Sequence, residues 1–122
     1  MSAAAPKTVR PSALTSAQLH AALAQLPGWE VVHTPATSAE SPATRELFRS
    51  YRFAAFEDAM AFMAAAVPFI SAQDHHPRWE NSWRSVSVWL CTHDAGHQPT
   101  QLDITLAEHL DSLRQGFAPA RN

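Results

Sequence analysis

The residues best suited to acid–base chemistry are two adjacent histidines, His75 and His76, in the stretch "DHHPRW" at residues 74–79. Pro77 fixes its own φ and disfavours the helical region for the residue before it, so we expect the pair to lie just after a helix has ended. A third histidine, His93, falls at the end of a predicted strand. Imidazole titrates closest to neutral pH, so histidines around a cleft could give and take protons in one reaction.

The other histidines point to chemistry less strongly. His20 and His109 fall inside predicted helices and His33 ends an early strand, which favours surface or packing roles, while the role of His97 stays open. Zinc sites commonly use His-x-x-x-His on a helix or Cys-x-x-Cys, and no such pair lies on a predicted helix here. The stretch "HDAGH" could still contribute His93 and His97, but we expect no metal site.

Nucleophilic catalysis has little support. Cys91 alternates in phase with Ser85, Ser87 and Trp89 in a predicted strand, and a lone cysteine is usually a small packing residue. No serine sits in the context of a nucleophile elbow.

Three further side chains near the histidines each have two interpretations. Trp79 and Trp83 flank "DHHP"; they could pack in the core or an interface, or form a flat wall for a planar heterocycle. Asp103, the third residue of a predicted helix, could cap that helix, or reach across a cleft to a histidine or a substrate nitrogen. One carboxylate could do both.

Helices at the two ends and in the middle of the chain should carry these residues. The first follows the capping-box pattern of Thr15 and Gln18, repeats Leu19, Leu23 and Leu26, and stops before residues 27–28. The longest covers residues 56–73, and Pro68 should bend it or break its last turn. Its expected apolar stripe is Phe56, Met60, Met63, Val67 and Ile70. The last begins after Thr100, pairs it with Asp103, and has the stripe Ile104, Ala107, Leu110 and Leu113.

Alternating apolar residues predict the strands. Residues 29–33 and 45–53 form two, joined by a polar loop, with Leu47, Tyr51 and Phe53 on one face of the second. Residues 80–83 form a short extended segment. In residues 85–91 apolar and other side chains alternate, which predicts a strand with Val86, Val88 and Leu90 on its buried face. The order αββαββα predicts an α+β fold with a four-stranded antiparallel sheet covered by helices on one face.

Composition narrows the function further. The 122 residues form one domain, expected at 14–117, with a flexible tail at 1–13 and a short tail at 118–122. A net charge of -2 with scattered basic residues argues against direct nucleic-acid binding. No apolar run is long enough for a membrane span, and residues 1–13 lack the apolar region of a signal peptide. With a single cysteine there is no disulfide framework, so we expect a cytoplasmic protein.

Taken together, "DHHPRWENSW", "CTHDAG", "LDITLA" and the earlier "LPGW" closely resemble the signature of the pterin-4a-carbinolamine dehydratases. This family includes a bifunctional member that also serves as dimerisation cofactor of a homeodomain transcription factor. The resemblance implies the αββαββα fold, a homodimer or homotetramer, and dehydration of 4a-hydroxytetrahydropterins to quinonoid dihydropterins in the recycling of the hydroxylase cofactor tetrahydrobiopterin. It implies no metal or organic cofactor.

The resemblance also implies the site residues. His75, His76 and His93 match the three active-site histidines of the family. We assign His76 and His93 to proton transfer, in an order that stays open, and His75 to holding the pterin. The residues that match the surroundings of the pterin are Asp74, Trp79, Cys91, Thr92 and Asp103.

Three departures from the family pattern define the alternatives. Ser71 stands where many members carry an acidic or other polar titratable residue that helps to bind the pterin, Trp83 replaces a frequent tyrosine, and residues 94–102 are one residue longer than usual. The chain could therefore be a weak or inactive relative that assists assembly of another enzyme, as is thought for RuBisCO in carboxysome-bearing bacteria. It could also be a transcriptional coactivator with a protein partner.

Overall fold

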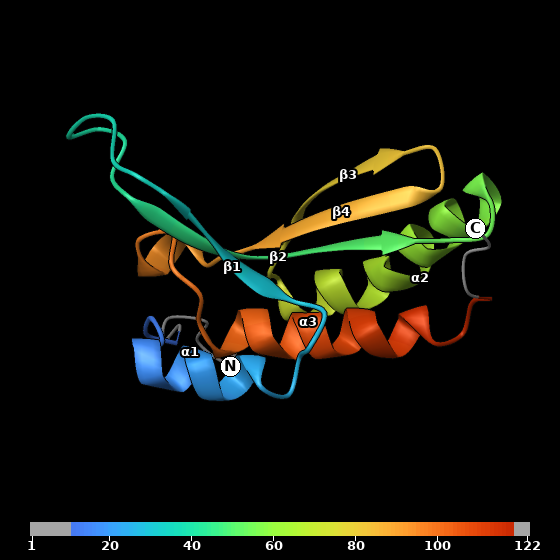
Figure 1. Ribbon diagram of the computed structural model, residues 1–122, viewed down its shortest axis with the longest axis horizontal. Coiled ribbons are helices and arrows are strands. Elements are labelled where there is room, and N and C mark those ends of the chain that lie inside the picture. Colours follow the sequence, from blue (N-terminus) through green and yellow to red (C-terminus); the bar gives the residue numbers. More distant parts are fainter. Residues whose placement is uncertain (1–10, 119–122) are drawn as a thin grey trace, which may run out of the picture.

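The computed structural model of the chain describes residues 11–118, which form an α+β fold in the predicted order. Helix α1 (Ser16–Leu23) precedes strands β1 (Glu30–Thr34) and β2 (Thr44–Arg52), helix α2 (Phe56–Gln73), strands β3 (Arg78–Ser82) and β4 (Ser85–Leu90), the 3-10 turn η1 (His93–Ala95) and helix α3 (Gln101–Arg114). The four strands form one antiparallel sheet in the order β1-β2-β4-β3. Figure 1 shows the three helices on one side of this sheet, as predicted.

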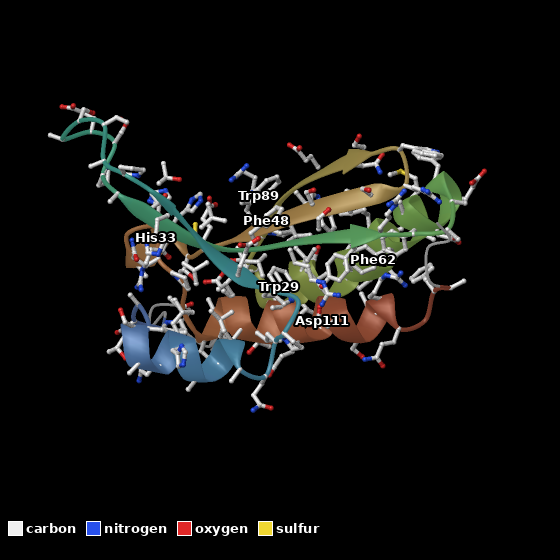
Figure 2. All side chains as sticks on the ribbon, viewed as in Figure 1. Trp29, His33, Phe48, Phe62, Trp89 and Asp111 are labelled. Carbon is white, nitrogen blue, oxygen red and sulfur yellow. The ribbon has the colours of Figure 1, made fainter. Side chains whose placement is uncertain are left out.

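The core lies between the sheet and the helices, and the strand alternation follows the prediction. Leu47, Tyr51 and Phe53 are buried, as are Val86, Val88 and Leu90 on the neighbouring strand. Residues of the opposite parity face the open side of the sheet. There the rings of Phe48 and Trp89 pack with centroids 5.0 Å apart (Figure 2).

Helix α2 has the predicted bounds but buries a different face. Its buried residues are Ala59, Phe62, Ala66 and Ile70, whereas Phe56 and Val67 of the expected stripe are 45% and 49% exposed. The stripe prediction is therefore confirmed for Ile70, which is buried, and for Met63, which packs against the core, and it was wrong for Phe56 and Val67. The buried face is rotated from the predicted one by roughly a quarter turn at 3.6 residues per turn. The small alanines form the buried face because they let the helix approach the core closely.

Pro68 does not break α2. The helix continues to Gln73 and ends at Asp74, whose backbone is left-handed at φ 50°. Pro68 removes the hydrogen bond to the carbonyl of Ala64, but both residues lie on the solvent-exposed face, where water can satisfy that carbonyl.

Helices α1 and α3 begin at the predicted caps. Thr15 and Gln18 form a full capping box at α1, and Thr100 and Asp103 form one at α3. The apolar stripe of α3 also matches the prediction, with buried Ile104, Ala107 and Leu110 and with Leu113 packed against the core.

The β3–β4 hairpin differs from the prediction at its start and its tip. Strand β3 begins at Arg78 and not at Glu80, and Ser82 pairs with Ser85 across a two-residue turn. Trp83 occupies that turn with φ 53° and is 69% exposed. The turn lies at the end of the sheet opposite η1, so Trp83 does not form a wall near the histidines (Figure 1).

A polar cluster explains the stretch "LPGW". Oδ1 of Asp111 accepts hydrogen bonds from Nε1 of Trp29 at 3.0 Å, from Arg49 at 2.9 Å and from the Tyr51 hydroxyl at 2.5 Å, tying α3 to β2 and to the residue before β1 (Figure 2). A Cβ on Gly28 would lie 2.4 Å from the Arg49 guanidinium, so any larger residue at this position would require the guanidinium to move.

Most of the expected tails, residues 1–10 and 119–122, fall outside the part of the chain that the structure describes. Among the helices within residues 11–118, none combines the length and apolar character needed to cross a membrane.

Candidate active site

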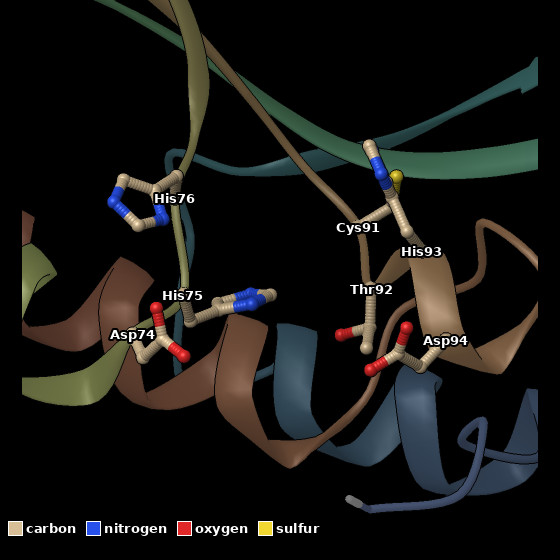
Figure 3. Close-up of a pocket in the computed structure, with 7 residues that line it drawn as sticks. All are labelled: Asp74, His75, His76, Cys91, Thr92, His93 and Asp94. Carbon is tan, nitrogen blue, oxygen red and sulfur yellow. The ribbon is translucent and has the colours of Figure 1, made fainter.

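Two chain segments bring the predicted residues together in one cavity. The first follows the left-handed end of α2, where the backbone N–H groups of Asp74 and His75 still bond to the last turn of the helix. The second connects β4 to η1. Between them lies a cavity of about 260 Å³ (Figure 3). Its lining residues are Asp74, His75, His76, Cys91, Thr92, His93 and Asp94.

A buried histidine–carboxylate contact lies behind the wall of this cavity. Nε2 of His75 lies 2.6 Å from Oδ1 of Asp103, and the two side chains are 6% and 0% exposed. An ionised carboxylate can only accept hydrogen bonds, so Nε2 of His75 is the donor and Nδ1 is the nitrogen left for other partners. Buried pairs of this kind fix the orientation of the imidazole ring.

Asp103 performs both of the roles considered from the sequence. Its Oδ2 accepts from the Thr100 backbone N–H at 2.9 Å, which caps α3, and from the Thr92 hydroxyl at 2.8 Å. The Thr92 and Thr100 hydroxyl oxygens are 2.7 Å apart. Because the single Thr92 hydrogen is directed to Asp103, Thr100 donates to Thr92. Both carboxylate oxygens of Asp103 and the hydroxyls of Thr92 and Thr100 thereby have hydrogen-bond partners, which makes this network a rigid support for His75.

The two other histidines of the cavity are exposed. Figure 3 shows the His75 ring extending toward the Thr92 side, whereas the His76 ring extends to the opposite side of its own backbone. The His93 ring packs on His97, with centroids 4.5 Å apart and an angle of 32°. Exposed side chains change rotamer on the picosecond to nanosecond scale, so His76 can turn toward a bound molecule.

A second cavity, of about 330 Å³, adjoins the first and shares His76, Cys91 and His93 with it. It lies on the open face of the sheet, and its other lining residues are Thr34, Thr44, Glu46, Arg78, Trp89 and His97. Within residues 11–118, no three His, Cys, Asp or Glu side chains are grouped so that they could hold a metal ion.

The Cys91 thiol stays protonated at neutral pH. Burial, followed by the charges of Glu46 and Asp103, raises the pKa of Cys91 to about 12. A nucleophilic cysteine needs a lowered pKa, so this environment disfavours covalent catalysis.

Trp79 lines neither cavity. It pairs with Val88 across the β3–β4 ladder and packs, partly buried, against the core. Its predicted contact with a substrate stays a prediction.

Seven lining residues were not among the predicted site residues: Thr34, Thr44, Glu46, Arg78, Trp89, Asp94 and His97. A usable signal existed for Thr44, Glu46, Arg78 and Trp89, because they occupy the parity opposite to the buried or partly buried positions of β2, β3 and β4. Asp94 lies within η1, a turn that no pattern predicted, and His97 follows that turn.

Comparison with known proteins gives consistent results. Residues 12–113 match the family model described as pterin 4 alpha carbinolamine dehydratase. A Rhodopseudomonas palustris protein, named by inference as a pterin-4-alpha-carbinolamine dehydratase, is 38% identical over 106 residues, covering 87% of this chain and 95% of its own. An Opitutus terrae protein of the same name is 37% identical, covering 84% and 95%.

A solved structure is also similar. The crystal structure of a transcriptional coactivator/pterin dehydratase from Brucella melitensis superposes with a TM-score of 0.71 at 31% identity. The match covers 84% of this chain and 99% of that one.

Proposed function

The chain belongs to the pterin 4a-carbinolamine dehydratase family, and we propose on this basis that it dehydrates 4a-hydroxytetrahydropterins, such as 4a-hydroxytetrahydrobiopterin, to quinonoid dihydropterins. One observation carries the proposal. A single cavity presents two exposed imidazoles, His76 and His93, beside a third, His75, that is fixed by a buried carboxylate.

The reaction requires one proton donor and one proton acceptor. The substrate carries a hydroxyl on C4a and a hydrogen on the neighbouring N5. An acid protonates the hydroxyl, the C4a–O bond breaks, and water leaves. A base removes the N5 proton, and the electron pair of the N–H bond forms the C4a=N5 double bond. General acid–base catalysis of this type contributes about 10²–10⁴-fold to the rate.

The residues divide between proton transfer and positioning. His76 and His93 transfer the protons to and from the substrate, because both side chains are exposed in the cavity. His75 holds the pterin through Nδ1, because Asp103 occupies its Nε2 and fixes its ring. Asp103 is a positioning residue. The Thr92 hydroxyl is engaged by Asp103, and the backbone N–H of Thr92 donates to the Gln98 carbonyl, so Thr92 is a positioning residue as well. Cys91 offers its backbone to the pterin.

A homodimer or homotetramer completes the proposed assembly. Phe56 and Val67 of α2 are large apolar side chains that the chain itself leaves about half exposed. A second copy of the chain would cover this face, since exposed apolar patches commonly mark interaction sites.

The same face of α2 favours a second candidate function, the binding of a different protein, as in an assembly factor or coactivator. The two functions make opposite predictions for the cavity. A protein-binding role would tolerate removal of His76 or His93, whereas the dehydratase would not.

The direct test is the rate at which enzymatically generated 4a-hydroxytetrahydropterin loses water with and without the protein. The proposal expects acceleration over the spontaneous reaction in proportion to protein concentration. A folded sample that leaves the spontaneous rate unchanged would refute it.

A further inference from the structure

His97 packs against one of the two histidines that the proposed function assigns to proton transfer. The ring centroids of His93 and His97 lie 4.5 Å apart, with an angle of 32° between the ring planes. The His93 side chain is exposed and lines both cavities, whereas His97 lines the second cavity and not the first. His97 therefore supports the His93 ring from the side of the second cavity and leaves it accessible from the first.

The backbone of His97 is held in an uncommon conformation. Its φ is 59°, in the left-handed region that residues other than glycine seldom adopt. Its N–H donates to the Thr92 carbonyl at 3.1 Å, and its carbonyl accepts from the Arg45 N–H at 3.2 Å. A strained conformation of this kind persists only where the surrounding structure fixes it, and such positions cluster at functional sites. Two segments of the chain thus fix the direction in which the His97 side chain leaves the backbone.

The turn that carries the two stacked rings is joined to the support of His75. Thr92 and Gln98 close this turn, because the Thr92 N–H donates to the Gln98 carbonyl at 3.0 Å. The Thr92 hydroxyl donates to Asp103, whose other carboxylate oxygen bonds to His75. Residues 92–98 are therefore anchored on a buried hydrogen-bond network, which gives the two rings a rigid base.

We propose that His97 is a positioning residue for proton transfer by His93; this rests on the proposed function and adds a residue to it. An exposed imidazole has three χ1 wells and two broad χ2 wells, so an unsupported His93 ring would spend only part of its time in reach of the substrate. Packing against a fixed neighbour restricts that choice and holds the proton-transfer group in its reactive geometry. His97 lies within residues 94–102, which depart from the family pattern, so the resemblance assigns it no role.

The test compares two substitutions of His97. His97→Asn removes the ring and introduces a residue type that tolerates the left-handed backbone. His97→Phe keeps an aromatic face and has no titratable group. The matched control is His20→Asn, the same change at an exposed histidine of α1 that lines neither of the two cavities. Circular dichroism and urea unfolding establish that each variant is folded.

The first readout is the motion of the His93 ring, measured without turnover. NMR relaxation of protein labelled with carbon-13 at the histidine Cε1 atoms gives an order parameter for each ring. The order parameter of His93 should fall in His97→Asn, because the ring has then lost its packing partner. It should return toward the wild-type value in His97→Phe and stay unchanged in His20→Asn.

The second readout is the dehydration rate at saturating substrate. This rate should fall about three- to sixfold in His97→Asn, the loss expected if one of roughly six side-chain conformations of His93 is productive. The affinity for biopterin should be unchanged, because the proposal gives His97 no contact with the pterin. His97→Phe should recover most of the lost rate. Such a recovery assigns the effect to packing, since phenylalanine cannot transfer a proton.

An unchanged His93 order parameter in His97→Asn would overturn the inference, as would a wild-type dehydration rate in that variant despite a more mobile ring. Equal loss of activity in His97→Asn and His97→Phe would also overturn it, because packing alone would then not account for the effect. A wild type with no dehydratase activity, but with a His93 ring that His97 restricts, would refute the proposed function and leave the support of His93 by His97 standing.

Discussion

Nε2 of His75 lies 2.6 Å from Oδ1 of Asp103, although the two residues are 28 positions apart in the chain. The pair joins the end of α2 to the first turn of α3, because Asp103 also caps that helix. One carboxylate thus links helix capping to the orientation of a candidate active-site histidine.

We predict that Asp103→Asn lowers both stability and pterin affinity. The amide cannot accept from His75, Thr92 and Thr100 together, and a buried hydrogen-bonding group left without a partner costs about 1–3 kcal/mol. Urea unfolding measures the first effect and fluorescence titration with biopterin the second. Glu108→Gln, on the exposed face of the same helix, is the control. An unchanged unfolding midpoint in Asp103→Asn would contradict the account of this pair.

Tyr51 is the single tyrosine of the sequence, so the tyrosinate absorbance reports its ionisation alone. Burial, and then the hydrogen bond and charge of Asp111, raise the pKa of Tyr51 above its ordinary value of 10.0. Since the folded pKa exceeds the unfolded one, this group stabilises the fold fully below pH 10.0 and less as the pH rises above it.

Tyrosinate absorbance should therefore appear only when the protein unfolds in alkali, whereas urea-unfolded protein should titrate near the ordinary value. Circular dichroism recorded in parallel detects the unfolding. Ionisation near pH 10 with intact secondary structure would show that the Tyr51 hydroxyl is not buried against Asp111.

Cys91 should react slowly in the native protein. With its pKa raised to about 12, far less of it is thiolate at neutral pH than in an ordinary cysteine, so iodoacetamide should modify native protein at least a hundredfold more slowly than unfolded protein, an order-of-magnitude expectation from the thiolate fraction. Glu46→Gln should accelerate the native reaction, because the Glu46 charge contributes to the shift. Similar modification rates in native and unfolded protein would contradict the raised pKa of Cys91.

The same shift gives a pH dependence of stability. The folded pKa lies above the ordinary 9.0, so the contribution of Cys91 is complete below pH 9.0 and is lost as the pH rises toward 12. The stability of the wild type should consequently decline relative to Cys91→Ser over that interval. If the stabilities of the wild type and of Cys91→Ser declined in parallel, the raised pKa of Cys91 would be contradicted.

Local sequence chemistry accounts for the elements that could be predicted. Thr15 and Thr100 mark helix starts through contacts within four residues, and the alternation of Val86, Val88 and Leu90 reports one buried face directly. The buried face of α2 could not be read in this way. Alanines at 59 and 66 carry no strong apolar signal, and the bulkier Phe56 and Val67 suggested the wrong side.

The candidate site was predictable only in part for a related reason. Neighbours in sequence such as His75 and His76 stand out, but Glu46, Arg78 and Trp89 come together only through the register of three strands. Periodicity assigns residues to a face and cannot align one strand with the next. The positive φ of Trp83 was equally hidden, because the turn that it occupies lacks glycine and asparagine.

Val67→Lys should reduce the oligomeric state. Lysine at a half-exposed apolar position of α2 would place a charge in the proposed interface between copies, which is costly when unpaired. Sedimentation velocity should show a smaller species than for the wild type. Ala65→Lys, exposed on another side of α2, should sediment like the wild type. A wild-type monomer, or a Val67→Lys oligomer of unchanged mass, would contradict the proposed interface.

The central claim is that His76 and His93 transfer the protons of the dehydration. It is tested most directly by the dehydration rate of 4a-hydroxytetrahydropterin with the wild type, His76→Ala, His93→Ala and the control His20→Ala, an exposed histidine of α1. We predict a loss of about 10²-fold or more for each cavity variant and none for the control. Full activity in both cavity variants would contradict the assignment, and a wild type no faster than the spontaneous reaction would contradict the dehydratase function itself.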